Sequence, residues 1–234
     1  MIRSKIHALI AAVIFIHGTS LSAQSEDLED QELWVGAQFC YKPNKKWVFG
    51  LEQQLRRKDN FKTTDQYFTE VNLKHYISKN MYLGLGGRYI SKNDTKGKKT
   101  GYENHVRLNA DLGYKHKLDA FKFYYRVRLQ GKNERNVSEL EGDKTEHTLR
   151  FKASTLYAIK KWPLDPKVSA ELFNDLGVPA SVNKFRITIG TNYQAKHFGE
   201  FGLFYRFQRQ VNRTPVLPTH IFGMRYKYTL KRKK

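Results

Sequence analysis

The feature that most constrains the fold of this chain is a two-residue alternation of apolar and polar side chains that recurs along most of its length. Successive side chains of a β-strand point to opposite faces, so a strand with one apolar face has this period. Within 102–116, for example, Val106 and Leu108 alternate with His105 and Arg107. Eleven segments follow the pattern and none has the 3.6-residue period of a helix. The sequence therefore predicts an all-β protein.

Two features favour a membrane barrel over a secreted soluble β-protein, which is the alternative. The runs extend over about 10–15 residues, whereas strands of soluble proteins most often have about 5–6. Aromatic residues lie near the ends of the runs, where membrane barrels place their interfacial girdles. These residues are Tyr67, Tyr89, Tyr102, Tyr114, Tyr193 and Tyr228. The mean hydropathy of −0.66 excludes a helical multi-span protein. We predict a closed, transmembrane, antiparallel up-and-down β-barrel.

The connections between the runs alternate in length, as in outer-membrane barrels with short periplasmic turns and longer external loops. The short connections are 42–46, 78–80, 117–120, 160–166 and 195–199, and the long ones are 57–65, 91–101, 131–146, 174–183 and 212–219. This assignment places the C-terminus in the periplasm. Closed bacterial barrels normally have an even number of strands. Either the first run, 33–41, is not a full strand, or a twelfth strand is hidden, so we expect ten to twelve.

The N-terminus resembles an export signal. Arg3 and Lys5 precede the apolar run 8–16 and a series of small residues that ends at Ala23. This order is typical of a cleaved secretory signal peptide, and the apolar run is too short to span a bilayer. We predict four segments: a signal peptide (1–23), an acidic linker (24–32), the barrel (33–230) and a basic tail (231–234). The expected location is the bacterial outer membrane.

The alternation predicts a strongly basic barrel interior. The chain contains 42 Lys and Arg against 22 Asp and Glu, a net charge of +20. Glu103, Arg107, Arg126, Arg128 and Arg150 come from adjacent runs and form the expected lumen charge cluster. Side chains fill narrow barrels and facing charges pair, so the first hypothesis is a non-catalytic structural or lipid-interacting barrel with a largely plugged lumen. The alternative is a narrow pore that favours anions.

Other chemistries have little support in the sequence. A membrane-embedded esterase or lipase is the second alternative, but His105 and Ser154 lie two runs apart and there is no G-x-S-x-G motif. The eight His residues lack the spacing of a metal site, and no cofactor is expected. Cys40 is the only cysteine, which excludes an intramolecular disulfide. Export and the separation of charges from aromatics argue against nucleic acid as a partner. We therefore expect no enzymatic activity.

Basic residues in two long loops predict contact with lipopolysaccharide phosphates, for which lysine is a suitable partner. They are Arg57, Lys58, Lys62, Lys92, Lys96, Lys98 and Lys99. The tail 231–234 is expected to face anionic headgroups. Outer-membrane lipids are thus the expected partners, and the oligomeric state is left open.

Several stretches resemble a known family. They include LWVGAQFCYKPNKKWVFGLEQQLR (33–56), DQYFTEVNLKHYI (65–77) and GLFYRFQRQVN (202–212). They are similar to the uncharacterised Bacteroidetes outer-membrane proteins grouped as domain of unknown function 2490. The resemblance implies an outer-membrane barrel and no particular activity. The C-terminal pattern of Gly223, Tyr226 and Tyr228 is also similar to the signal read by the barrel-assembly machinery, although Leu230 and the basic tail follow it.

Overall fold

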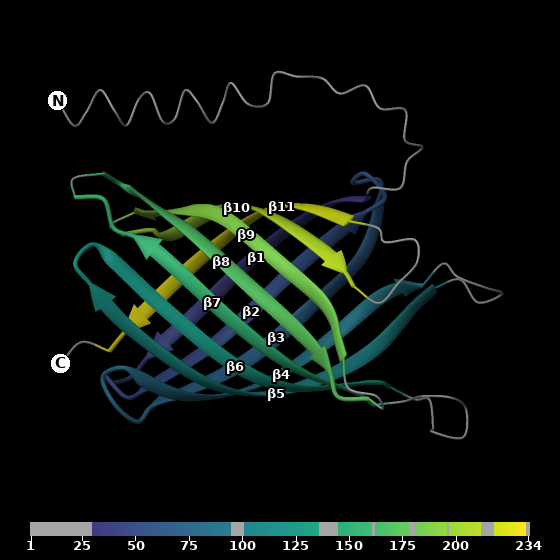
Figure 1. Cartoon of the computed structure of the whole chain (residues 1–234), viewed down its shortest axis with the longest axis horizontal. Coiled ribbons are helices and arrows are strands. Elements are labelled where there is room, and N and C mark those ends of the chain that lie inside the picture. Colours follow the sequence, from purple (N-terminus) through teal and green to yellow (C-terminus); the bar gives the residue numbers. More distant parts are fainter. Residues whose placement is uncertain are drawn as a thin grey trace, which may run out of the picture.

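A computed structural model describes residues 30–94, 101–135, 145–160, 162–177, 181–195, 197–211 and 218–232. The predicted signal peptide and residues 24–29 of the predicted linker lie outside the described residues. Every regular element in the described part is a β-strand, as the alternation predicts (Figure 1). No helix in these ranges is long and apolar enough to cross a membrane.

The described part of the chain contains eleven strands of 12 to 18 residues. They are β1 (Asp30–Lys42), β2 (Trp47–Lys58), β3 (Thr63–Tyr76), β4 (Met81–Asp94), β5 (Gly101–Leu118), β6 (Phe121–Glu134), β7 (Glu146–Tyr157), β8 (Leu164–Asp175), β9 (Ser181–Ala195), β10 (Gly199–Gln210) and β11 (Pro218–Lys231). The barrel thus begins three residues before the predicted boundary and ends one residue after it.

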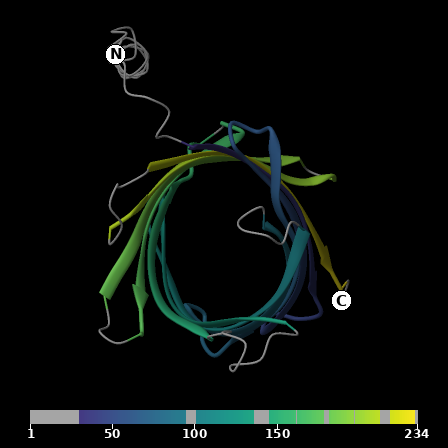
Figure 2. The same cartoon turned by 90° about the vertical axis from the view of Figure 1, so that its right-hand side faces the viewer.

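The strands close into a barrel in which each strand pairs with its neighbours in sequence, and β1 pairs with β11 (Figure 2). All pairs are antiparallel except β1–β11, which is parallel over thirteen residues of each strand. A ring of eleven strands that alternate in direction leaves the first and last running the same way. The first run is therefore a full strand, and the expectations of an even number and of wholly antiparallel pairing are wrong at this seam. The observed number lies within the predicted range.

The connections differ in length between the two ends of the barrel (Figure 1). Short turns join β2 to β1 and β3 to β4 at the end where β11 finishes, and the opposite end carries most of the longer connections, as predicted. The connection between β2 and β3 is an exception. It was predicted as a loop over 57–65 but is a four-residue turn, 59–62, because Arg57, Lys58 and Thr63 belong to strands. The side chain of Asp30 in β1 accepts hydrogen bonds from the backbone N–H of Asp59 and Asn60, at 2.9 and 3.4 Å.

The outer wall is apolar. Val71, Leu85, Leu108 and Leu203 lie within strands and are 58–64% exposed. The six tyrosines predicted near strand ends are also exposed, and the rings of Tyr67 and Tyr102 are 5.6 Å apart. The alternation predicted this outward face correctly.

The inner wall differs from the prediction because it also carries aromatic rings. Trp34, Phe68 and Phe173 are buried in the barrel, and Phe204 lies in the same interior. The ring of Phe204 lies over Gly223 of β11, where a Cβ atom would overlap with it. A strand glycine thus leaves space for a neighbouring aromatic ring, an arrangement that stabilises curved sheets.

Candidate functional site

The barrel encloses a cavity of about 480 Å³, which is the candidate functional site. Twelve Lys or Arg and six Asp or Glu line it, so its wall has an excess of six positive formal charges. A second cavity of about 100 Å³ shares Lys152, Arg206 and Arg225 with the first. The predicted excess of basic residues in the lumen is therefore present in the structure.

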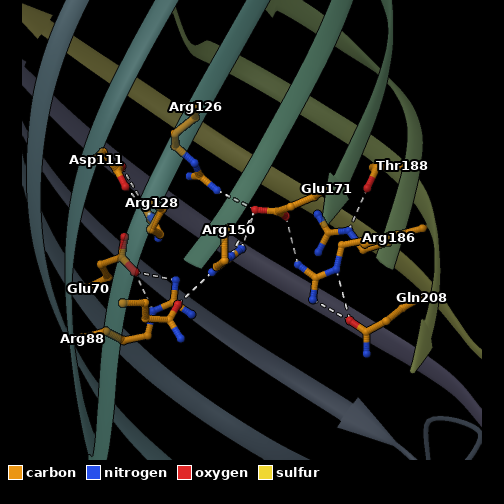
Figure 3. A network of polar contacts seen from close by, with 12 residues as sticks. Glu70, Arg88, Asp111, Arg126, Arg128, Arg150, Glu171, Arg186, Thr188 and Gln208 are labelled. Carbon is orange, nitrogen blue, oxygen red and sulfur yellow. Dashed lines mark hydrogen bonds and ion pairs between the residues drawn. The ribbon is translucent and has the colours of Figure 1, made fainter. Parts of the chain in front are cut away.

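Among the described residues, Glu171 of β8 is the centre of the largest ion-pair network (Figure 3). Its Oε1 atom accepts hydrogen bonds from Arg126 of β6 at 2.7 Å and from Arg150 of β7 at 2.8 Å. Its Oε2 atom lies 3.5 Å from Arg186 of β9. Only 3% of the Glu171 side chain is exposed. A single buried carboxylate therefore connects four consecutive strands, and its loss would leave three cations without this counter-charge.

Two further carboxylates hold one arginine each on neighbouring strands (Figure 3). Arg128 donates two hydrogen bonds to Asp111, at 2.6 and 2.8 Å, in the bidentate geometry that suits a guanidinium group. Arg88 donates to Glu70 at 2.6 Å. The first pair joins β6 to β5 and the second joins β4 to β3. Both pairs link adjacent strands of the barrel wall, and the charged groups in each pair are bound to each other.

The ring of Trp34 contacts arginines from strands on both sides of the parallel seam between β1 and β11. The Cζ atom of Arg56, on β2, lies 3.6 Å from the centroid of its ring. The Cζ atoms of Arg206 and Arg186, on β10 and β9, lie 4.7 and 5.5 Å away. The indole N–H donates to Glu32 at 2.6 Å. Each cation–π contact contributes about 0.5–2 kcal/mol, so Trp34 links strands on either side of β11 through the lumen.

Two phenylalanines have the same role elsewhere in the cavity. The Cζ atom of Arg88 lies 3.6 Å from the centroid of Phe68. Phe173 faces Arg150 at 4.4 Å and the Nζ atom of Lys184 at 5.3 Å. These rings provide electron-rich faces to cations, but they provide no full negative charge.

Three arginines that line the cavity have no carboxylate partner. Among the described residues, no carboxylate oxygen lies within 4 Å of the side-chain nitrogens of Arg56, Arg107 or Arg206. Arg56 donates to the side chain of Gln54 at 2.8 Å, and Arg206 donates to Thr188 at 3.0 Å. The buried Nε atom of Arg107 has no hydrogen-bond partner in the described structure. The cavity wall therefore combines neutralised and unneutralised cations.

The structure also gives evidence on a metal site and on a catalytic Ser–His pair, the two other kinds of site considered from the sequence. No group of three or more His, Cys, Asp or Glu residues in the described ranges could hold a metal ion. Ser154 pairs with Tyr124, which pairs with Lys115, ten residues along β5 from His105. At about 3.3 Å per residue this offset is about 33 Å. Ser154 and His105 therefore do not form a nucleophile–base pair.

Comparison with known proteins gives one family. The family model described as "Protein of unknown function (DUF2490)" matches residues 31–216. The chain belongs to this family. The matched region covers β1 from its second residue onward and all of β2 to β10, and therefore most of the lumen network. No curated protein and no solved structure matches the chain.

The predicted charge cluster is divided in the structure. Arg126 and Arg150 meet on Glu171, whereas Arg128 binds Asp111. Arg107 lines the same cavity, whereas Glu103 is not among the residues that line it. Glu103 lies 3.4 Å from the side chain of His105 at the start of β5. The structure thus places the four arginines at the cavity and Glu103 outside its lining.

Four of the predicted lipopolysaccharide-facing residues are described, and they lie at the end of the barrel with most of the longer connections. Arg57 and Lys58 end β2, Lys62 is in the turn, and Lys92 is in β4. Arg57 donates to the carbonyl oxygen of Lys62 at 2.9 Å, and Lys58 lies 3.8 Å from Asp65. Lys96, Lys98 and Lys99 lie outside the described residues.

The residues of the predicted assembly signal lie on β11. Gly223 faces the lumen beneath Phe204. The hydroxyl of Tyr226 donates to the carbonyl oxygen of Phe198 at 2.6 Å. The ring of Tyr228 stacks against Phe39 across the seam, with 6.2 Å between centroids. All three positions therefore have structural roles near the closure, whatever their role in assembly.

Sequence reasoning missed the residues that organise the site. Glu171 is not among the predicted site residues, and Trp34 belongs to the first run, 33–41, which the sequence did not establish as a full strand. A signal existed for both. Glu171 is paired in register with Lys152 and Arg186, but this information requires the alignment of three strands. Trp34 follows Glu32 at the two-residue spacing of one strand face.

Proposed function

We propose that this protein is a bacterial outer-membrane β-barrel whose interior is a structural, non-catalytic network of charges and aromatic rings. The observation that carries the proposal is the apolar outer wall of a closed barrel. Leu85 and Leu108 are 63% and 64% exposed in the middle of paired strands. Exposed aliphatic residues in this position are costly in water and favourable in lipid.

Strand length supports the same proposal. Every strand has at least 12 residues, and about 9–11 residues suffice for a tilted strand to cross the hydrocarbon core. On the outer wall, the polar side chain of Gln53 donates to Thr69 on the adjacent strand at 3.4 Å. In this arrangement the end with the short turns and the C-terminus faces the periplasm. The basic residues of the opposite end then face lipopolysaccharide.

The experiment is extraction and gel migration of the processed chain. We expect the folded protein to require detergent and to migrate faster on a gel before heating than after it, because a closed barrel resists unfolding by the detergent. A compact monomer that stays in solution without detergent would contradict the proposal. If the protein purified from a Gram-negative host still contains residues 1–23, the predicted cleavage of a signal peptide during export is wrong.

A narrow anion-preferring pore is the second candidate function. The specific observation is the excess of basic residues in the lining of the two cavities, which share Lys152, Arg206 and Arg225. Single-channel recording in planar bilayers separates this function from a closed structural barrel. If the barrel conducts, we expect Arg126→Glu to reduce its preference for anions. An unchanged reversal potential would exclude the basic lumen as the source of selectivity.

A further inference from the structure

We propose that the lumen contains a binding site for a small, soluble, multivalent oxyanion of the phosphate class, formed by Arg56, Arg107, Lys184 and Arg206. We call these four residues the oxyanion cluster. The inference goes beyond the proposed function, because it requires the closed lumen but not conductance or a membrane location.

All four residues line the 480 Å³ cavity, and three carboxylates of the lumen are engaged by other arginines. Glu171 contacts three other arginines, Asp111 contacts Arg128, and Glu70 contacts Arg88. In the described part of the chain, no carboxylate forms an ion pair with any member of the oxyanion cluster. Within the described residues, the cluster therefore holds positive charge without a direct counter-charge.

Two members of the cluster, Arg56 and Lys184, are influenced mainly by other cations, whereas Glu70 and Glu146 also act on Arg107, and Glu171 acts on Arg206. The four strongest Coulombic influences on Arg56 come from Arg88, Arg186, Arg107 and Arg206, all of them cations. The four strongest on Lys184 come from Arg186, Arg150, Arg107 and Arg56, which are also cations. Converging like charges in a cavity with restricted solvent are destabilising unless an anion lies among them.

The free donors fit an oxyanion. The buried Nε atom of Arg107 has no partner, and an N–H group without a hydrogen bond in a buried position is costly. The planar guanidinium group presents paired donors that match the oxygens of phosphate. Because Arg56 already covers the face of Trp34 and Arg206 that of Phe204, the aromatic rings are less available to stack on a ligand. The recognised part is therefore the anionic group.

The volume of the cavity indicates the size of the ligand, and its lining indicates whether the ligand is a soluble compound or a lipid. A volume of about 480 Å³ lies within the range of about 300–1,000 Å³ that small-molecule sites have. The charged lining would exclude the acyl chains of a lipid, so the phosphate group belongs to a soluble compound rather than to a lipid headgroup. Inorganic pyrophosphate is the simplest member of this class.

The test is calorimetric titration of the purified, folded full-length mature chain in zwitterionic detergent with inorganic pyrophosphate. Titrations with chloride at matched ionic strength and with a short-chain phosphatidic acid are run in parallel. We expect saturable binding of pyrophosphate, at least about ten-fold tighter than binding of chloride. Arg56→Gln and Arg107→Gln should each weaken this binding about ten-fold or more.

Lys227→Gln is the matched control. Lys227 faces the lumen near the end of β11, does not line either cavity, and carries the same charge. Its removal should change the affinity by less than about two-fold. Because Arg56→Gln and Arg107→Gln relieve repulsion, both variants should remain folded, with gel migration before heating like that of the wild type.

Three results would overturn the inference. They are an absence of saturable pyrophosphate binding to the folded wild type, an equal loss of affinity in Lys227→Gln, and binding of phosphatidic acid without binding of pyrophosphate. None of them depends on where the barrel resides. If the protein proves soluble, the same titration runs in buffer, so failure of the membrane proposal and failure of the anion site are distinguishable.

Discussion

The Cζ atom of Arg56 lies 3.6 Å from the centroid of the Trp34 ring, and the two residues are directly paired across β1 and β2. Arg206 and Arg186, which lie on the far side of β11, also contact this ring. The parallel seam between the two ends of the chain is thus supported from inside by one aromatic side chain. These cation–π contacts add to the stability that the backbone ladder of the seam already provides.

Truncation of Trp34 should therefore weaken the folded barrel. Trp34→Ala removes a buried ring that is 4% exposed together with three cation–π contacts, and we expect a loss of about 3–5 kcal/mol in the free energy of unfolding. Urea titration in detergent, read from gel migration without heating, measures the change. Trp162→Ala is the control, because Trp162 is 57% exposed and should cost little. Equal losses in the two variants would show that Trp34 has no special role at the seam.

Neutralising Glu171 should be more harmful than neutralising a carboxylate at the periphery. Glu171→Gln leaves Arg126, Arg150 and Arg186 without their common counter-charge, and breaking a buried ion pair costs about 3–5 kcal/mol. Glu200→Gln is the comparison, since Glu200 lies 3.9 Å from Arg225 in a more exposed pair worth about 1 kcal/mol or less. The same urea titration applies. A Glu171→Gln barrel as stable as the wild type would mean that solvent already neutralises these arginines.

A side chain at position 223 should disturb the packing of β10 on β11. In Gly223→Ala the new Cβ overlaps with the Phe204 ring, and overpacking of this kind costs about 1–3 kcal/mol. Gly87→Ala should be tolerated, because its Cβ would meet no atom closer than 3.7 Å.

Refolding from urea into detergent is the appropriate measurement for the two glycine variants, because it separates packing from recognition by the assembly machinery. Gly223→Ala should refold less completely than Gly87→Ala. If Gly223→Ala fails only in cells and refolds normally from urea, the glycine serves assembly rather than packing.

The loss of stability caused by an arginine at two different depths on the outer wall tests whether lipid or water surrounds the barrel. Leu108 and Leu118 are exposed to nearly the same extent, 64% and 61%, but Leu108 lies in the middle of β5 and Leu118 at its end. In a membrane, Leu108→Arg should cost about 2–4 kcal/mol and Leu118→Arg about 0–1 kcal/mol. Unfolding titrations after reconstitution in lipid vesicles measure both. Equal and small effects would indicate that water surrounds the wall.

Much of the architecture was predictable because strand periodicity is a local property. The residues Val106 to Leu112 reveal an outward apolar face without any knowledge of their neighbours, and the same is true of Phe201 to Phe207. The first strand was harder to recognise, because Trp34, Gly36 and Cys40 on its inner face are not charged. Its contrast between faces is weak, although it is a full strand of 13 residues.

The lumen was predictable only in composition. Alternation identified Arg126, Arg128 and Arg150 as inward-facing, but it did not reveal that Glu171 lies between two of them and Arg186. The partner of an inward charge depends on the register of adjacent strands and on the reach of each side chain. Neither quantity is encoded within a single segment.

The amino-acid order alone established an all-β chain with an apolar face, a basic face and one end richer in long connections, because each of these follows from neighbours in the sequence. Closure by eleven strands, the parallel seam and the division of arginines into neutralised and unneutralised sets arose only in three dimensions. They depend on contacts between residues as distant as Trp34 and Arg206. Such contacts form only after the whole ring has closed, and its geometry decides which charges meet.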